Sequence, residues 1–391
     1  MSLNIGAIKS IQMTDLSEEQ QMILETARDV AQEKIAPLAA GYDEKEEFPW
    51  KSVKYLQELG FMAMMVDPEY GGSGLDTVSY SIAMEEISKA CASTGVTMSV
   101  NNSLYAYPVQ TYGTAEQKEE FLTPIVSDHL GAFGLSEPDA GSDPASMRTM
   151  ATKEGDDYIL NGSKMWITNG GAADYYVIFA RTNPELRHKG ISAFIVKKGD
   201  PGFEIGPKEK KLGIRASSTT PLSFDQCRIP ESRRLGEEGQ GFKIAMNTLN
   251  GGRIGIASQA IGIGQASIEA ATAYMKEREA FGGPIARFQG LQFMIADSVM
   301  EVDAARQLTW RAARMKDAGQ RYVKEAAMAK LYASEAAVRA ADRGLQIHGG
   351  AGYSRDFPVE RYWRDAKITA IYEGTSEILR VVIARETLGK F

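Results

Sequence analysis

The spacing of hydrophobic residues predicts helices in the first third of the chain. A Ser-Glu-Glu-Gln sequence at residues 17–20 has the capping-box pattern of a helix N-terminus. Apolar residues follow it at helical spacing until Pro37, namely Met22, Leu24, Ala27, Val30, Ala31 and Ile35. Similar spacing recurs over residues 52–59, 77–89 and 114–125. We therefore expect the chain to be all-helical up to about residue 128.

From residue 131 the pattern changes to short apolar runs. Two such runs, at 158–160 and 165–168, flank Asn161-Gly162, which is a strong signal for a β-hairpin turn. Further apolar runs are bounded by Gly, Pro or Asn and occupy residues 176–180, 191–196 and 222–224. This texture predicts a small β-barrel or sandwich that ends near residue 236.

Helical spacing returns in the last third of the chain, over residues 241–278, 288–318, 322–347 and 375–388. Short loops join these segments, so neighbouring helices are expected to run antiparallel in a bundle. The glycines Gly255, Gly262 and Gly264 lie inside the first segment. We interpret them as sites of close helix packing, because no strand precedes them as in a dinucleotide-binding motif.

Together these patterns predict an α+β protein of three domains. An N-terminal α-helical domain would span residues 1–128, a middle β domain residues 129–238, and a C-terminal four-helix bundle residues 239–391. A chain of 391 residues is long enough for such units to share a core and enclose a sizeable cavity.

Composition and charge narrow the classes of partner. The net charge of −7 gives no general basic field, which argues against nucleic acid and against an anionic membrane surface. Cys91 and Cys227 show no CxxC spacing, so neither a disulfide framework nor a zinc site is indicated. A reducing compartment fits: the cytoplasm, or the mitochondrial matrix if the source is eukaryotic. There is no run of about 18 uncharged apolar residues, so no membrane span is predicted, and we interpret the first dozen residues as a leader or a non-native extension.

Two segments of the middle region could hold a ligand. The stretch 135–143 is rich in Ser, Gly and Asp, which suits a loop around a polar ligand but suits a solvated connection better. Trp166 and Thr168 stand together near a strand end. They could stack on a planar ring and hydrogen-bond its edge, and a core tryptophan explains them equally well.

Six motifs give the chain a resemblance to the acyl-CoA dehydrogenase family, over nearly its whole length. In chain order they are the 135–143 loop, Trp166-Ile167-Thr168-Asn169, Gly251-Gly252-Arg253, Arg278-Glu279-Ala280-Phe281-Gly282, Gln346-Ile347-His348-Gly349-Gly350 and Tyr372-Glu373-Gly374-Thr375.

The resemblance implies a homotetramer with one FAD per subunit, held between the β domain and the C-terminal bundle. Residues of the same subunit expected around the flavin are Phe133, Leu135, Ser136, Gly141, Ser142, Trp166, Ile167, Thr168, Thr375 and Glu377. A neighbouring subunit would add residues toward the adenosine diphosphate portion: Arg278, Phe281 and Gln289, with Gln346, Ile347, Gly349 and Gly350 also near it.

For the substrate, the resemblance implies contacts from Ser142, Asn250, Arg253, Tyr372 and Gly374. Arg253 also stands out by itself, because helical spacing puts this cation on an apolar stripe where it needs partners. Many family members have Asp where this chain has Asn250. An amide hydrogen bond is therefore expected here in place of a charge contact to the adenine end of coenzyme A.

The resemblance makes Glu373 the catalytic base, although a solvated carboxylate would otherwise be the plainer interpretation of this loop residue. Some branches of the family place the base immediately before the helix arginine, and that position here is Gly252, which cannot act. Burial against an acyl chain is expected to raise the pKa of Glu373 toward the working pH.

The implied reaction is FAD-dependent α,β-dehydrogenation of a short-chain acyl-CoA to the trans-2-enoyl-CoA, with electrons passing to electron transfer flavoprotein. Residues 91–96 and 101–104 look most like the short-chain, butyryl-type members. Four alternatives stay open: a branched short-chain acyl-CoA dehydrogenase, an acyl-CoA oxidase, a flavin monooxygenase on the same fold, and a silent CoA-thioester-binding protein.

Overall fold

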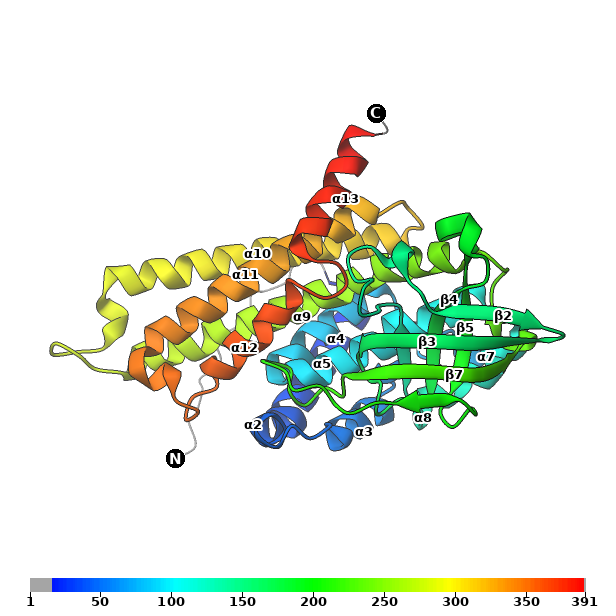
Figure 1. Cartoon of the computed structure of the whole chain (residues 1–391). Coiled ribbons are helices and arrows are strands. Elements are labelled where there is room, and N and C mark those ends of the chain that lie inside the picture. Colours follow the sequence, from blue (N-terminus) through cyan, green and yellow to red (C-terminus); the bar gives the residue numbers. More distant parts are fainter. Residues whose placement is uncertain (1–15, 390–391) are drawn as a thin grey trace.

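The computed structural model describes residues 16–389, and the predicted leader lies outside them. Figure 1 shows three parts: a group of helices from the first third of the chain, a β-sheet, and long helices from the last third that extend away from the sheet. The predicted order of α, then β, then α is therefore confirmed.

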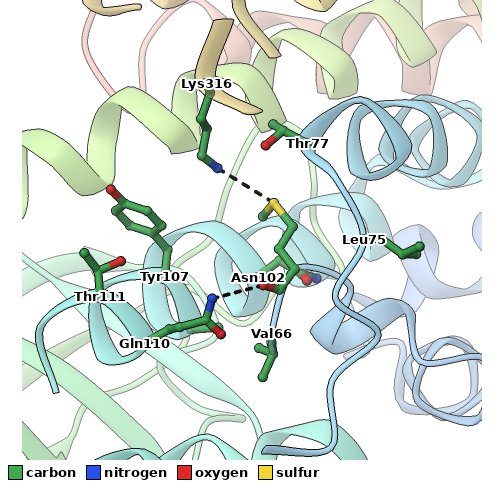
Figure 2. A pocket seen from close by; sticks show the side chains of 10 residues that line it. Val66, Leu75, Thr77, Asn102, Tyr107, Gln110, Thr111 and Lys316 are labelled. Atoms are coloured by element: carbon green, nitrogen blue, oxygen red, sulfur yellow. Dashed lines mark hydrogen bonds between the residues drawn. The ribbon is translucent and has the colours of Figure 1, made fainter. Parts of the chain in front are cut away.

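The N-terminal part contains eight α-helices among the described residues: α1 (Glu18–Val30), α2 (Ala36–Lys45), α3 (Trp50–Glu58), α4 (Thr77–Ala90), α5 (Ala92–Ser99), α6 (Tyr107–Tyr112), α7 (Ala115–Phe121) and α8 (Thr123–Ser127). The predicted capping box is present at Ser17. The Ser17 hydroxyl accepts from the Gln20 N–H, and the Gln20 side-chain oxygen accepts from the Ser17 N–H. A π-helical segment, Val100–Ala106, joins α5 to α6, and its Asn102 lines a pocket together with Tyr107 and Lys316 (Figure 2).

The sequence predicted that the first helix ends near Pro37, and this prediction was wrong. A π-helical segment, Ala31–Ile35, continues α1 into α2, and Pro37 lies in the first turn of α2. In that π-helical turn the Ala36 N–H donates to the Ala31 carbonyl oxygen, and Pro37, which has no N–H to donate, follows it. Met22 was also misplaced on the apolar stripe, since its side chain is exposed.

The middle part is one sheet of eight strands among the described residues: β1 (Gly131–Gly134), β2 (Met150–Glu154), β3 (Asp157–Ile167), β4 (Tyr175–Arg181), β5 (Ile191–Lys197), β6 (Phe203–Ile205), β7 (Thr220–Pro230) and β8 (Arg234–Leu235). The strand order is β6-β7-β3-β2-β4-β5-β8, and β1 pairs in parallel with β4.

The predicted hairpin at Asn161-Gly162 was wrong, because both residues lie inside the continuous strand β3. The pairing of β3 with β7 shifts register between Leu160 and Gly162, which marks a β-bulge. Gly162 has φ +142°, and a Cβ there would lie 2.7 Å from Thr149 Cα. The glycine therefore serves a bulge and a close backbone approach rather than a turn.

The C-terminal part consists of α9 (Gly241–Glu277), α10 (Gln289–Asp317), α11 (Val323–His348), α12 (Val359–Thr369) and α13 (Ser376–Leu388). The sequence patterns had not indicated α12. A Cβ at Gly255 would lie 2.4 Å from the Tyr80 hydroxyl, and one at Gly262 would lie 2.4 Å from the Glu85 carbonyl oxygen. Both neighbours belong to α4, so these two glycines allow α4 to pack closely on α9, as predicted.

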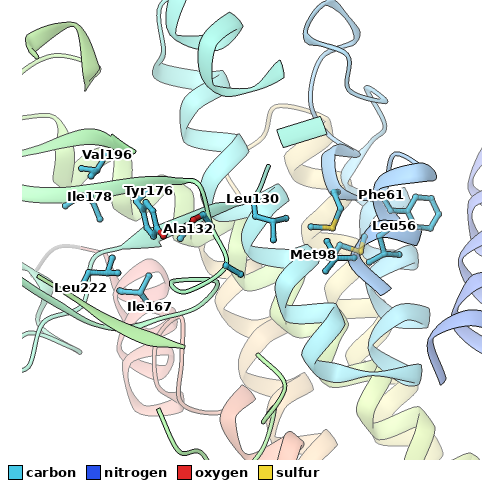
Figure 3. Packing of buried hydrophobic residues seen from close by; sticks show 14 of the residues in the cluster. Leu56, Phe61, Met98, Leu130, Ala132, Ile167, Tyr176, Ile178, Val196 and Leu222 are labelled. Carbon is cyan, nitrogen blue, oxygen red and sulfur yellow. Dashed lines mark hydrogen bonds between the residues drawn. The ribbon is translucent and has the colours of Figure 1, made fainter. Parts of the chain in front are cut away.

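The core is continuous between the helices and the sheet. One cluster of buried side chains joins Leu56 and Met98 of the N-terminal helices to Ile178 and Val196 of the sheet (Figure 3). Such shared burial fixes the sheet against the helices and thereby the loops at their junction. Among residues 16–389, no helix is both long and apolar enough to cross a bilayer.

Candidate active site

Glu373 lies in the loop of residues 370–375 between α12 and α13, which we call the Glu373 loop. Glu373 has φ +53° and Gly374 has φ +103°, so two consecutive residues adopt left-handed conformations. Such a conformation is costly for a glutamate and persists only where surrounding contacts hold it. Thr375 then caps α13, with its hydroxyl accepting from Ile378 N–H at 3.4 Å.

This turn directs the Glu373 carboxylate toward Gly252 on α9. A Cβ at position 252 would lie 2.2 Å from Glu373 Oε2 and 2.8 Å from Leu104 Cδ2. The carboxylate thus occupies the space that a side chain at position 252 would need. A side chain at position 252 and the Glu373 carboxylate as it stands here could therefore not both occupy this space.

Glu373 is half-buried as a residue, but the Oε2 atom of its carboxylate is buried. Its Oε2 atom has no hydrogen-bond partner in the described part of the chain. Burial raises the pKa of Glu373 to about 7, against the opposing effects of the cations Lys330 and Arg253. A carboxylic acid with such a pKa can exchange a proton near neutral pH, which is what a general base requires.

Arg253 lies on α9 one residue beyond Gly252 and is only 6% exposed. Its Nη1 donates to Asn250 Oδ1 at 2.8 Å, and its Nε donates to the Glu373 carbonyl oxygen at 3.5 Å. Burial lowers the pKa of Arg253, and the nearby Glu373 carboxylate opposes that shift. The cation expected on an apolar stripe is therefore buried, and it contacts the Glu373 loop.

Lys330 is a site residue that the sequence analysis missed. It lies on α11, is fully buried, and donates from Nζ to the Gly374 carbonyl oxygen at 2.7 Å. Its helical neighbours Ala326, Ala327 and Ala333 are buried too. The rule that identified Arg253, a cation on an apolar face, would have identified Lys330 as well.

Tyr372 anchors the other side of the loop. Its hydroxyl hydrogen-bonds to Gln259 Oε1 on α9, and Gln259 Nε2 donates to the Ala92 carbonyl oxygen at 2.9 Å. Contacts from α9 and α11 thus hold the Glu373 loop at three successive residues, Tyr372, Glu373 and Gly374.

The 135–143 loop is anchored by a buried ion pair and is not a merely solvated connection. Glu137 and Ala140 exchange backbone hydrogen bonds of 3.1 Å across the loop. Lys164, fully buried in β3, donates to Glu137 Oε1 at 2.7 Å and to the Leu135 carbonyl oxygen at 3.3 Å. Burial alone would raise the pKa of Glu137, but Lys164 and the Arg148 N–H hold it below its usual value.

Trp166 lies beside this loop, because Met165 N–H donates to the Ser136 carbonyl oxygen at 2.9 Å. It has φ +64° and is 57% exposed, so it is not a core tryptophan. Other residues expected near the flavin differ in accessibility: Phe133, Leu135 and Ile167 are buried in the core, Ser136 and Thr168 are half-buried, and Gly141 and Ser142 are exposed.

A second group of expected cofactor residues lies far from Glu373. Arg278, Phe281 and Gln289 surround the connection from α9 to α10 and are exposed, Phe281 by 90%. At the end of α11, Gln346, Gly349 and Gly350 are exposed, and buried Ile347 packs with Met275 and Ile285 of the same end. The rise of α9 from Gly252 to Arg278 is roughly 39 Å. Within one chain this group and the Glu373 loop therefore cannot meet.

The three-part fold, with the acidic side chain of Glu373 facing Gly252 on α9, defines the class of the protein: it is an acyl-CoA dehydrogenase fold. Family models describing the N-terminal, middle and C-terminal domains of acyl-CoA dehydrogenases match residues 17–129, 132–227 and 239–388. The chain belongs to the acyl-CoA dehydrogenase family, and it is an enzyme of that oxidoreductase class.

Three relatives show how close the similarity is. The mitochondrial short-chain specific acyl-CoA dehydrogenase of Mus musculus is 53% identical over 381 residues, which cover 97% of this chain and 92% of the relative. The butyryl-CoA dehydrogenase structure from Megasphaera elsdenii has a TM-score of 0.94 at 46% identity, covering 96% of this chain and 99% of that one. A chain in a structure described as the electron transferring flavoprotein of Acidaminococcus fermentans has a TM-score of 0.95 at 48% identity, with coverages of 96% and 99%.

Proposed function

We propose that this enzyme converts a short-chain acyl-CoA to the trans-2-enoyl-CoA, with Glu373 removing the α-proton. The observation that carries the proposal is the Glu373 carboxylate itself: its Oε2 is buried and has no partner in the described part of the chain, and its pKa is raised to about 7. The two flanking cations, Arg253 and Lys330, keep the anionic form accessible in spite of burial.

The Glu373 loop would also bind the thioester. The Tyr372 N–H donates to Ile368 and the Ser376 N–H to Ala370, while the Glu373 N–H makes no backbone hydrogen bond in the described loop. That N–H is available to donate to the thioester carbonyl oxygen, where negative charge develops as the α-proton leaves. Ser142, Asn250 and Arg253 remain the other proposed substrate contacts. The side-chain oxygen Oδ1 of Asn250 already accepts from Arg253, and the side-chain N–H groups of Asn250 are available.

The residues present fit a bound flavin. Trp166 offers an exposed aromatic face beside the anchored 135–143 loop, and no atom lies within 4 Å of a Cβ placed at Gly141, Gly349 or Gly350. When bound, FAD would supply the acceptor for the β-hydride. We assign to its site the residues named for it above, with Thr375 and Glu377 at the start of α13.

The distance between the two groups of cofactor residues supports a homo-oligomer, which we propose to be a homotetramer. The group around Arg278 and Gly349 cannot reach the Glu373 loop of its own chain, since α9 alone separates them by roughly 39 Å. A neighbouring copy would bring that group to the flavin, as the exposed Phe281 suggests. Size measurement by light scattering with and without FAD tests this arrangement.

Close packing around Gly255 supports the proposal of a short acyl chain. One turn beyond Gly252, a Cβ at Gly255 would lie 2.4 Å from the Tyr80 hydroxyl and 2.7 Å from Ser99 Oγ. Tyr80 and Ser99 also hydrogen-bond to each other at 3.1 Å, which closes the packing between α4, α5 and α9. Anaerobic bleaching of the flavin by a series of straight and branched acyl-CoAs tests this preference. Faster bleaching by a long or a branched chain than by butyryl-CoA would contradict it.

Electron transfer flavoprotein is the proposed acceptor of the electrons, supported by the similarity to the chain from the Acidaminococcus structure. The reduced enzyme is expected to reoxidise slowly in air and rapidly with that flavoprotein. Rapid reoxidation by oxygen alone would indicate an oxidase instead. The proposed compartment is the cytoplasm, or the mitochondrial matrix in a eukaryote.

A further inference from the structure

We infer that Lys330 is a positioning residue of the reaction: its ammonium group holds the Glu373 loop in shape and supplies a buried positive charge beneath the base. This inference rests on the proposed function, because it assigns a role toward Glu373 as the base.

The first support is the contact with the loop. Lys330 Nζ donates to the Gly374 carbonyl oxygen at 2.7 Å, directly after the two left-handed residues Glu373 and Gly374. The orientation of that carbonyl depends on ψ of Gly374, a residue with few backbone restrictions. A fixed donor below the loop removes this freedom and so fixes where the Glu373 side chain points.

The second support is that Lys330 forms no ion pair with a carboxylate among residues 16–389. Its one hydrogen bond in the described part of the chain goes to a neutral carbonyl, although the side chain is fully buried. A cation buried in this way costs stability unless something nearby uses its charge. The acidic group with the largest effect on it is Glu373, with a smaller effect from Glu377.

The charged and titratable groups around Glu373 come from four elements. They are Lys330 of α11, Arg253 of α9, Tyr80 of α4 and, in the loop itself, Tyr372. Among these the two cations favour the carboxylate form. Burial lowers the pKa of Lys330 to about 7, and Glu373 opposes that shift, so the two groups titrate as a coupled pair.

The direction in which the Glu373 pKa shifts when Lys330 is replaced follows from the positive charge of Lys330. Without the Lys330 cation, the anionic form of Glu373 loses stabilisation, so the pKa of Glu373 rises further. More of the base is then protonated at neutral pH, and the rise of rate with pH moves to higher pH. A loss of stability alone would lower the melting temperature without moving that midpoint.

The test compares Lys330→Met, which removes charge and donor, with Lys330→Arg, which retains both. Lys324→Met is the matched control, since Lys324 is half-exposed on the same helix. For each FAD-loaded enzyme, the rate of anaerobic flavin bleaching by butyryl-CoA is measured between about pH 6 and pH 9. Independently of activity, hydrogen exchange is measured for the peptide covering residues 370–376.

We expect Lys330→Met to move the midpoint of the pH profile upward by about one unit, equivalent to about tenfold slower bleaching below the midpoint. It should also speed exchange in residues 370–376. Lys330→Arg should restore the midpoint, and Lys324→Met should change neither quantity. An unchanged midpoint and unchanged exchange in Lys330→Met would overturn the inference. If that variant does not fold, Lys330→Gln is judged by the same two measurements.

Glu373→Gln in the same series separates this inference from the proposed function. If Glu373→Gln is still bleached rapidly, Glu373 is not the base, and both proposals fail. If Glu373→Gln is not bleached but Lys330→Met behaves as the wild type, only the role of Lys330 fails.

Discussion

Replacing Gly252 by alanine should slow catalysis without lowering the stability of the fold, because the added methyl group displaces the Glu373 carboxylate but favours the helix. A Cβ at this position would lie 2.2 Å from Glu373 Oε2, whereas ordinary contact begins near 3.4 Å. The carboxylate must therefore retreat by about 1.2 Å. A displacement of about 1 Å in a reacting group can cost about 10²-fold in rate.

The same substitution should not weaken the fold by much. Alanine in place of glycine inside a helix gains about 1 kcal/mol in intrinsic propensity. The atoms in its way, Glu373 Oε2 and Leu104 Cδ2, are the far ends of flexible side chains. We therefore expect a melting temperature equal to or above that of the wild type, together with flavin reduction about 10²-fold slower.

Gly251→Ala is the matched control, since its Cβ would meet only Lys316 Nζ at 3.7 Å and the Tyr322 hydroxyl at 3.9 Å. It should give the same gain in helix propensity and leave the rate unchanged. The assays are thermal unfolding and single-turnover flavin bleaching by butyryl-CoA. Wild-type bleaching by Gly252→Ala would refute the placement of the carboxylate against this glycine.

Four further predictions concern the Glu373 carboxylate and the ion pair that anchors the 135–143 loop. Glu373→Gln should retain FAD and slow flavin reduction by about 10²- to 10⁴-fold, the range for loss of a general base, as measured by stopped-flow absorbance. The bleaching rate of the wild type should rise with pH through the raised Glu373 pKa of about 7; a flat profile from pH 5 to pH 9 would contradict it. Because of that raised pKa, the folded protein binds the Glu373 proton more tightly than the unfolded chain does, and ionisation of Glu373 lowers the stability of the fold as pH rises from about 4.5 to 7. In urea titrations, Glu373→Gln should therefore be more stable than the wild type at pH 8 but not at pH 4. Lys164→Met leaves Glu137 buried without its cation and should cost roughly 3–5 kcal/mol of unfolding free energy and weaken FAD retention, whereas Arg148→Met, which breaks an ion pair whose arginine is 80% exposed, should cost about 0–1 kcal/mol.

Much of the fold could be predicted from the sequence because its signals are local. The capping box at Ser17 and the helical spacing over α9 to α11 depend on neighbours within one or two turns. The errors arose where a local signal has two meanings. A proline can end a helix or sit in its first turn, as Pro37 does, and Asn-Gly can form a hairpin turn or a bulge, as at Gly162.

The site was predictable only in part, because its parts come from distant segments. The motifs pointed to Glu373, and the apolar stripe pointed to Arg253. No spacing in the sequence reveals that Glu373 fills the space above Gly252, since the two are brought together by the packing of the Glu373 loop on α9. Lys330, a cation among the alanines of α11, gave the same signal as Arg253, but its partner, the Gly374 backbone carbonyl, leaves no trace in the sequence.

The most direct measurement of the central claim is anaerobic mixing of the FAD-loaded enzyme with butyryl-CoA, with the wild type and Glu373→Gln side by side and absorbance of the oxidised flavin followed in time. The wild type should bleach rapidly, and Glu373→Gln should keep the oxidised spectrum with its flavin still bound. Rapid bleaching of Glu373→Gln, or no bleaching of the wild type, would contradict that claim.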